Sequence, residues 1–266
     1  MAICTFAVME LQFYKYQGTG NDFVLIDNRQ HTFSKNDTKL VARLCDRKFG
    51  IGADGLILLE EHPAVDFKMV YYNADGNQSS MCGNGGRCIV HFAEYLGMIS
   101  KNTTFEAIDG LHEAKIERGC VHLKMNDVTN IQTEEDFAYL DTGSPHHVQL
   151  VENLADFNVF VNGRNIRNNR YGKAGANVNF VEKLEENTFA VRTYERGVED
   201  ETLSCGTGVT AVALAMFETG KATSNKVILQ QPGGELQIHF NKIEKGYGDI
   251  YLIGPATQVF NGIITV

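Results

Sequence analysis

The chain has 266 residues, enough to bury one large hydrophobic core or two medium ones. Its formal net charge of -9 and its sequence pI near 5.4 argue against nucleic acid as a partner. No stretch approaches the roughly 20 consecutive apolar residues that a membrane span requires, so we expect no membrane partner either.

The N-terminal segment Met1–Met9 lacks a basic region and is too short for a secretory signal. Two alternatives stay open for it: translation starts at Met9, or residues 1–10 form a disordered extension. The six cysteines show no dense pattern, which favours a reducing compartment over a disulfide scaffold. We therefore expect a cytoplasmic protein with free thiols at Cys4, Cys45, Cys82, Cys88, Cys120 and Cys205.

Most of the predicted elements are short β-strands. Runs rich in β-branched and aromatic residues predict strands at Phe13–Tyr16, Phe23–Asp27, Phe67–Asn73, Val121–Met125, Val148–Val151, Val178–Val181, Thr188–Tyr194, Lys226–Leu229 and Leu236–Phe240. Between them, an amphipathic pattern predicts a surface helix over Asp37–Lys48. The polar segment Asn158–Gly175 gives no assignment.

Two further helices are predicted at Arg87–Leu96 and Val209–Phe217, ended by Gly97 and Gly220 at C-cap positions. The second is apolar almost all round, and such a helix is buried on every side. We expect sheet to be wrapped around it. The mixture of many short strands and few helices predicts the α+β class.

A weak internal duplication relates the two halves of the chain. Cys82 and Cys205 are separated by 123 residues (205 − 82), and the segments Phe67–Gly76 and Phe189–Gly197 resemble each other at nearly the same offset. The turn-then-strand pattern after Asp109 also recurs before Phe240. Features in the same order at a nearly constant offset predict two homologous halves.

The halves are expected to meet near residues 126–138. We therefore predict an N-terminal domain over residues 1–127 and a C-terminal domain over residues 128–255. The last segment, residues 256–266, is expected to be a strand that packs on the N-terminal domain.

The most informative motif occurs twice, as Met81-Cys82-Gly83-Asn84-Gly85-Gly86 and as Ser204-Cys205-Gly206-Thr207-Gly208. In both copies a cysteine precedes a glycine-rich turn that opens an apolar helix. Unpaired backbone N–H groups at a helix N-terminus stabilise a thiolate and lower its pKa from about 8.5 to about 3.5–7.5. One such cysteine suggests a nucleophile, whereas two suggest an acid and a base that work as a pair.

Inversion at a carbon needs a base on one face and an acid on the other, with matched pKa values. Such a pair titrates as a unit. The N–H groups of Gly83, Asn84, Gly206 and Thr207 are predicted to converge on one carboxylate, whose neutralisation stabilises the adjacent carbanion.

Other interpretations of the same residues carry less weight. Most buried cysteines are small inert hydrophobes, and we assign that role to the four outside the repeated motif. A Cys82–Cys205 disulfide is expected only as an oxidation product. No Cys-x-x-Cys or His-Glu-x-x-His spacing predicts a metal site, and Gly18–Phe23 lacks the third glycine of a dinucleotide fingerprint.

With these residues in place, the sequence from Leu11 to the C-terminus resembles the diaminopimelate epimerase family. The motifs that carry the resemblance are Gly18–Phe23, Gly50–Gly55, Asn73–Gly76, Met81–Gly85, Gly143–His146, Asn177–Phe180, Tyr194–Gly197 and Ser204–Gly208. The family consists of cofactor-independent amino-acid racemases. The resemblance implies two similar domains, each a curled β-sheet or barrel around a central α-helix, with the active site in the interdomain cleft.

The resemblance also assigns roles to residues. Cys82 and Cys205 are implied to be the acid/base thiols, with no cofactor and no metal. The positions that match substrate-binding or thiol-tuning residues of the family are Asn21, Asn73, Gly83, Asn84, His146, Asn177, Glu195, Arg196, Gly206 and Thr207. The implied reaction interconverts LL- and meso-2,6-diaminopimelate in lysine and peptidoglycan precursor synthesis, in a homodimer.

Two positions depart from the pattern. Some family members carry Asn where Ser144 stands and Gln where Gly55 stands, so recognition of the distal end of the substrate is expected to differ in detail. Two alternative functions stay open: a racemase of another amino acid, of the proline or hydroxyproline type, and a non-catalytic amino-acid-binding protein.

Overall fold

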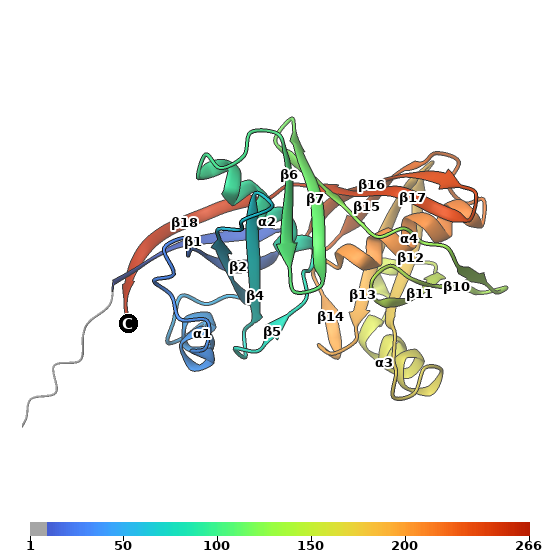
Figure 1. Cartoon of the computed structure of the whole chain (residues 1–266). Coiled ribbons are helices and arrows are strands. Elements are labelled where there is room, and N and C mark those ends of the chain that lie inside the picture. Colours follow the sequence, from blue (N-terminus) through green and yellow to red (C-terminus); the bar gives the residue numbers. More distant parts are fainter. Residues whose placement is uncertain (1–9) are drawn as a thin grey trace, which may run out of the picture.

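The computed structural model describes residues 10–266 and shows two lobes side by side, built mainly of β-strands (Figure 1). The two alternatives for the start of the chain concern residues 1–9, which lie outside the described residues. Glu10 is the first residue of a strand, so the predicted disordered extension is wrong at that position.

The first lobe contains ten elements before residue 125. They are β1 (Glu10–Gly18), β2 (Asn21–Asp27), α1 (Thr38–Cys45), β3 (Gly55–Glu60), β4 (Phe67–Asn73), β5 (Gln78–Ser79), α2 (Gly83–Tyr95), β6 (Asn102–Ala107), β7 (Gly110–Glu117) and β8 (Cys120–Lys124).

The second lobe follows the same plan. Its elements are β9 (Ile131–Thr133), β10 (Phe137–Asp141), β11 (Pro145–Leu150), the short 3₁₀ helix η1 (Leu154–Asp156), α3 (Val159–Asn169), β12 (Asn177–Glu185), β13 (Thr188–Glu195), β14 (Asp200–Thr202), α4 (Gly206–Glu218), β15 (Lys226–Gln231), β16 (Gly234–Ile243) and β17 (Gly246–Gly254), and the chain ends with β18 (Thr257–Thr265).

The strand pairings repeat element for element. In the first lobe β2 pairs in parallel with β3 and β4 with β6, and in the second lobe β11 pairs in parallel with β12 and β13 with β15. The intervening pairs β3–β4 and β12–β13 are antiparallel in both. The duplication read from sequence is therefore a duplication of topology, and the α+β class is confirmed.

The lobes also exchange strands. β8 pairs with β17 across the junction, and β18 returns to pair with β1. The predicted boundary at residue 127 falls between β8 and β9 and stays a prediction.

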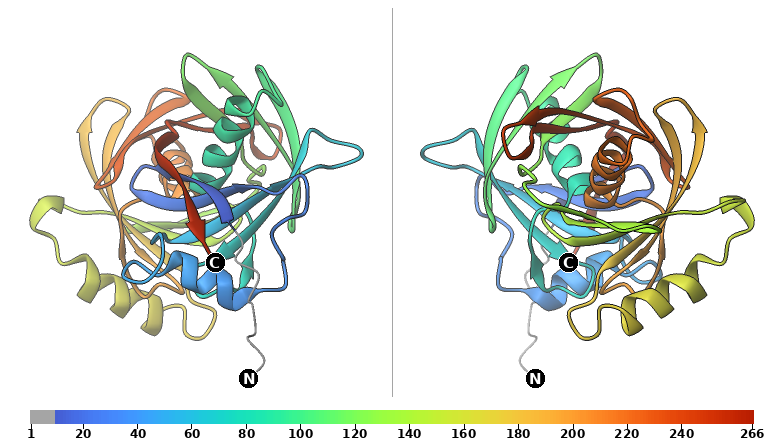
Figure 2. Two further views of the ribbon diagram at one scale, coloured as in Figure 1. Left: turned by 90° about the vertical axis from the view of Figure 1, so that its left-hand side faces the viewer. Right: turned by 90° about the vertical axis from the view of Figure 1, so that its right-hand side faces the viewer.

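Each lobe surrounds one helix with strands, α2 in the first and α4 in the second (Figure 2). Along α4 every residue from Gly208 to Met216 is buried, so this helix packs on all sides as its sequence predicts. α1 and α3 lie outside the strands. Within residues 10–266, no helix has the length and apolar character needed to cross a membrane.

The structure shifts the predicted helix starts. α2 begins at Gly83 and α4 at Gly206, three to four residues before the predicted starts, and the glycines form the first helical turn. Gly97 and Gly220 follow the helices with positive φ, as predicted. The unassigned segment after residue 158 contains α3, whose start is capped by the Asn158 side chain.

Candidate active site

The N-termini of α2 and α4 meet at their first residues. A Cβ atom added to Gly83 would lie 3.5 Å from the Cα atom of Gly206, and one added to Gly206 would lie 3.3 Å from the Cα atom of Gly83. The Cβ atom added to Gly83 would also lie 2.6 Å from Leu252 Cδ2, and the one added to Gly206 would lie 2.9 Å from the same atom. An added side chain at either position would clash with Leu252, so glycine at both positions lets the two helix ends approach closely beside that side chain. Cys82 and Cys205 are the N-cap residues of these two helices, so the contact brings the two cysteines to one place.

The Cys82 thiol, half-buried, caps α2. Its Sγ atom accepts a hydrogen bond from Gly85 N at 3.2 Å. Burial raises the pKa of this thiol to about 11, and the charge of Glu195 adds to the rise, while the N–H groups of Gly85 and Asn84 and the Arg87 cation act against it.

The Cys205 thiol is more deeply buried, with 7% of the residue exposed. Its Sγ atom lies 3.5 Å from Thr207 Oγ1. Burial raises its pKa to about 12, helped by the charges of Glu195 and Cys82 and opposed by Thr207 and Gly208 N–H.

The expected lowering of the thiol pKa values is therefore wrong for this ligand-free structure. The helix N-termini stabilise the thiolates as predicted, but removal of the sulfur atoms from water raises the pKa more. The sequence shows the N-terminal position of the cysteines and does not show how deeply the tertiary structure buries them.

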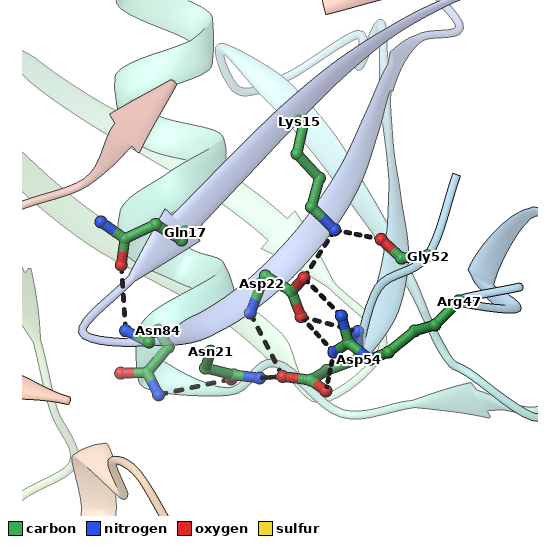
Figure 3. A network of polar contacts seen from close by, with 9 residues as sticks. Lys15, Gln17, Asn21, Asp22, Arg47, Gly52, Asp54 and Asn84 are labelled. Carbon is green, nitrogen blue, oxygen red and sulfur yellow. Dashed lines mark hydrogen bonds and ion pairs between the residues drawn. The ribbon is translucent and has the colours of Figure 1, made fainter. Parts of the chain in front are cut away.

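Asn21 and Asn84 belong to one polar network of the first lobe (Figure 3), and Asn84 extends it to the second lobe. Asn84 Nδ2 donates to Asn21 Oδ1 at 3.3 Å and to Ser204 O, in the other lobe, at 3.4 Å. Asn21 Nδ2 in turn donates to Asp54 Oδ2 at 2.7 Å, and Arg47 Nη2 binds Asp54 Oδ1 at 2.8 Å. The Asn84 side chain is thus engaged within the protein, which leaves its backbone N–H for the predicted carboxylate.

A second cluster forms around Asn177 in the other lobe. Asn177 Oδ1 accepts from Arg196 N at 2.8 Å, and Asn177 Nδ2 donates to Ser144 Oγ at 3.2 Å. Arg196 Nη2 reaches the same Ser144 Oγ at 3.4 Å. Ser144, one of the departures from the family pattern, therefore still supplies a hydrogen-bonding group between two predicted site residues.

His146 lies behind this cluster and is fully buried. Asn177 Nδ2 and Asn179 Nδ2 approach its two ring nitrogens at 3.4 and 3.1 Å. Burial and the charge of Arg196 lower the pKa of His146 to about 3, so its ring is neutral at physiological pH.

Glu195 is the last residue of β13, and its charge raises the pKa of both thiols. Burial raises the pKa of Glu195 itself; the nearby Thr202 hydroxyl opposes this rise, and Asp54 adds to it. Asn73, at the corresponding end of β4, is exposed and pairs in register with Gly55. The structure therefore brings Cys82, Gly83, Cys205 and Gly206 together where α2 and α4 meet, and joins Asn177, Arg196 and His146 in a separate cluster, whereas Asn73 is exposed at the end of β4.

Two residues in contact with this site were not predicted from sequence. Arg87 is fully buried in α2, and its guanidinium donates to Gly83 O at 3.1 Å, Asn84 Oδ1 at 3.1 Å, Thr19 Oγ1 at 3.2 Å and Pro255 O at 3.3 Å. Asn179 is also fully buried, and a Cβ on Gly208 would lie 2.5 Å from its Oδ1 atom. The sequence held one signal for Arg87: it is a charged residue in a predicted helix that is otherwise largely apolar.

Within residues 10–266, no group of three or more His, Cys, Asp or Glu side chains is arranged to hold a metal ion. The five cysteines of this part of the chain are free thiols. The site offers two thiols, backbone N–H donors and amide side chains, together with the guanidinium of Arg196 and the carboxylate of Glu195.

Several solved structures share this architecture. A phenazine biosynthesis protein of the PhzF family from Bacillus anthracis superposes with a TM-score of 0.79 at 12% sequence identity, covering 97% of this chain and 100% of that one. A hydroxyproline epimerase from Agrobacterium vitis superposes with a TM-score of 0.67 at 13% identity, covering 97% and 93%. At this identity the likeness defines the fold class alone: a protein of two repeated α+β units.

Sequence comparison defines the family. The family model described as diaminopimelate epimerase matches residues 13–129 and 138–259. The chain is 55% identical to the diaminopimelate epimerase of Flavobacterium psychrophilum over 256 residues, 96% of this chain and 100% of that one, and 44% identical to that of Chlorobaculum tepidum over 94% and 99%. This chain belongs to the diaminopimelate epimerase family.

Proposed function

We propose that this protein interconverts LL- and meso-2,6-diaminopimelate without a cofactor, in the synthesis of lysine and peptidoglycan precursors. The observation that supports the proposal is the close approach of Gly83 and Gly206, because these glycines directly follow the N-cap residues Cys82 and Cys205 of the two lobes. Two thiols at one point have no use in ligand binding alone, whereas inversion of a carbon centre requires an acid and a base on opposite faces.

In the proposed reaction, one cysteine thiolate removes the α-proton and becomes a thiol. The other thiol donates its proton to the opposite face of the carbanion and becomes the thiolate. The two roles exchange in the reverse direction, so each turnover leaves one thiol and one thiolate. The backbone N–H groups of Gly83, Asn84, Gly206 and Thr207 hold the adjacent carboxylate and stabilise the negative charge that develops beside it.

The remaining polar groups hold the rest of the substrate. Arg196 offers a planar guanidinium that binds a distal carboxylate, with the amide of Asn177 next to it. Asn21 and Asn73 bind from the first lobe. Glu195, which is largely buried beside both thiols, accepts hydrogen bonds from the α-ammonium, and neutral His146 positions Asn177 from behind.

We further propose a cytoplasmic homodimer. Five free cysteines support a reducing compartment. Within the described residues β18 pairs only with β1, and it exposes the apolar side chains of Val259, Phe260 and Ile263. A free strand edge of this kind favours pairing with another chain. Analytical ultracentrifugation tests the prediction, and a monomer at micromolar concentration contradicts it.

The reaction is tested by exchange of the α-proton in deuterated water under reducing conditions, with diaminopimelate and proline as separate substrates. We expect deuterium to enter diaminopimelate. Label in proline alone would support a racemase of another amino acid. No exchange with either substrate would support an amino-acid-binding protein.

A further inference from the structure

The side chain of Tyr71 occupies the space that the absent side chain of Gly55 leaves open. Gly55 lies in β3 next to β4, which carries Tyr71. A Cβ atom on Gly55 would lie 2.5 Å from Tyr71 Cε2 and 3.2 Å from the Tyr71 hydroxyl oxygen. The phenol ring therefore lies directly over the glycine, at the point where some family members carry a glutamine.

Tyr71 lies on the face of β4 that points to the active site. Alternation along the strand puts Met69, Tyr71 and Asn73 on one face. Met69 Cε is 3.5 Å from a Cβ atom built on Gly85, and Cys82 Sγ is 3.2 Å from the same point. On this face of β4, Tyr71 thus lies between Met69, which packs near Cys82, and Asn73, which is predicted to bind the ligand.

The ring of Tyr71 is held by packing. The residue is 9% exposed and meets the ring of Phe23 edge-on, with ring centroids 5.9 Å apart. The ring therefore has a fixed position before any ligand binds.

The Tyr71 hydroxyl, in contrast, makes no hydrogen bond to another residue of the described part of the chain, residues 10–266. In that part of the chain, Thr202 Oγ1 is the only fully buried side-chain oxygen or nitrogen without a hydrogen-bond partner. The unpartnered Tyr71 hydroxyl is therefore not fully buried and is accessible to solvent. A phenol with a buried ring and an unpartnered, accessible hydroxyl is suited to hydrogen-bond a ligand.

The charges around this hydroxyl keep it protonated. Burial raises the pKa of Tyr71 far above its ordinary value, and the charges of Cys82, Asp54 and Glu195 add to the rise. The group is consequently a hydrogen-bond donor at every physiological pH.

We propose that Tyr71 is a specificity-determining residue whose hydroxyl donates a hydrogen bond to a carboxylate oxygen of the bound substrate. This inference rests on the proposed function, because it requires an amino-acid ligand between the two thiols. In this proposal, Tyr71 makes the hydrogen bond to the substrate that Gly55 cannot make, because glycine has no side chain.

The test measures binding of diaminopimelate by calorimetry to a Cys82→Ala, Cys205→Ala protein, with and without Tyr71→Phe. The Phe variant keeps the ring and removes only a hydroxyl that bonds to no described residue, so we expect the fold to be retained. We expect the Kd to rise about 10- to 100-fold, the effect of losing one hydrogen bond to a charged group. In the enzyme with both cysteines, Tyr71→Phe should raise KM by a similar factor and change kcat less than threefold.

Tyr72→Phe is the matched control. Tyr72 neighbours Tyr71 in β4 but points to the opposite face, and its hydroxyl donates to Lys35 O at 2.9 Å. Its loss should leave the Kd unchanged. An unchanged Kd in Tyr71→Phe, or a fall in kcat at constant KM, overturns the assignment of Tyr71. Absence of α-proton exchange in the wild-type protein would instead overturn the proposed function, so the two failures are distinguishable.

Discussion

The N-termini of α2 and α4 use the same backbone arrangement in two different surroundings. In both, a cysteine is the N-cap residue and a glycine begins the helix, but the Cys82 side chain accepts a capping hydrogen bond and that of Cys205 makes none. The interior of α2 carries the buried cation Arg87, whereas the corresponding position in α4 carries Thr210, whose hydroxyl bonds only to Gly206 O at 2.9 Å. The duplicated backbone therefore supplies matched geometry, and the side chains around it make the two thiols inequivalent.

The outer parts of the site differ in the same way. The first lobe holds Asn21 through Asp54 and the exposed Arg47. The second lobe holds Asn177 through the neutral, buried His146. One lobe thus fixes its amide with surface charges and the other with buried neutral groups.

Removal of either thiol should give the largest effect. If both lobes contribute equally to the reaction, Cys82→Ala and Cys205→Ala should each lower kcat at least about 10³-fold, since each removes an acid/base group. Racemisation is followed by circular dichroism or coupled assay, and the fold by the far-ultraviolet spectrum. Cys120→Ala, which changes a free cysteine that is not at the site, should keep normal turnover. Near-normal turnover in either site variant would exclude the two-thiol mechanism.

Arg87 and Thr210 form the next comparison. Arg87→Met should lower the free energy of unfolding by about 2–4 kcal/mol, because several buried acceptors lose their donor while removal of the buried charge offsets part of that loss. Thr210→Val removes one bond to a helix carbonyl and should cost about 1 kcal/mol or less. Urea denaturation measures both. Equal losses in the two variants would contradict the asymmetry described above.

The buried histidines predict that the second lobe is sensitive to acid. Burial lowers the pKa of His147 to about 4, against about 6.5 in the unfolded chain. The unfolded chain therefore takes up the proton first, and stability falls as the pH drops from about 6.5 toward 4. For this residue the loss is about 2 kcal/mol at pH 5.

His147→Gln should accordingly show a shallower decline of unfolding free energy between pH 7.5 and pH 5 than the wild type. The comparison at pH 7.5, where both states carry a neutral ring, serves as the baseline. Parallel declines of the two proteins would show that His147 does not contribute.

The smallest expected effect concerns the reactivity of the two thiols. Cys82 is half-buried and its pKa lies at about 11, whereas Cys205 is buried with a pKa of about 12. Since the thiolate is the nucleophile, iodoacetamide should alkylate Cys82 several-fold faster than Cys205 in the ligand-free protein, and both rates should keep rising from pH 7 to pH 9. Peptide mapping by mass spectrometry measures each rate. A plateau near pH 7 would mean that the helix N-termini outweigh burial.

Much of this protein was predictable because its signals are local. Alternating apolar residues indicated strands such as β4 and β13, and the near-complete apolarity of α4 indicated a helix enclosed by sheet. The cysteine–glycine motif located the site, because a thiol, a glycine and a helix start are adjacent in the chain. The start of α3 was missed although Asn158 is a favourable cap, since the polar composition that follows lacks a clear apolar period.

The sequence by itself determined the duplication, the fold class, the family and the two cysteines, since each depends on residue types at fixed spacing. Only the tertiary structure decided which groups surround those cysteines. The contact between Gly83 and Gly206, the buried guanidinium of Arg87 and the position of Tyr71 over Gly55 all join segments brought together by packing. The tertiary structure also determines the thiol pKa values, because the burial that raises them depends on the folded chain and not on the neighbouring residues in the sequence.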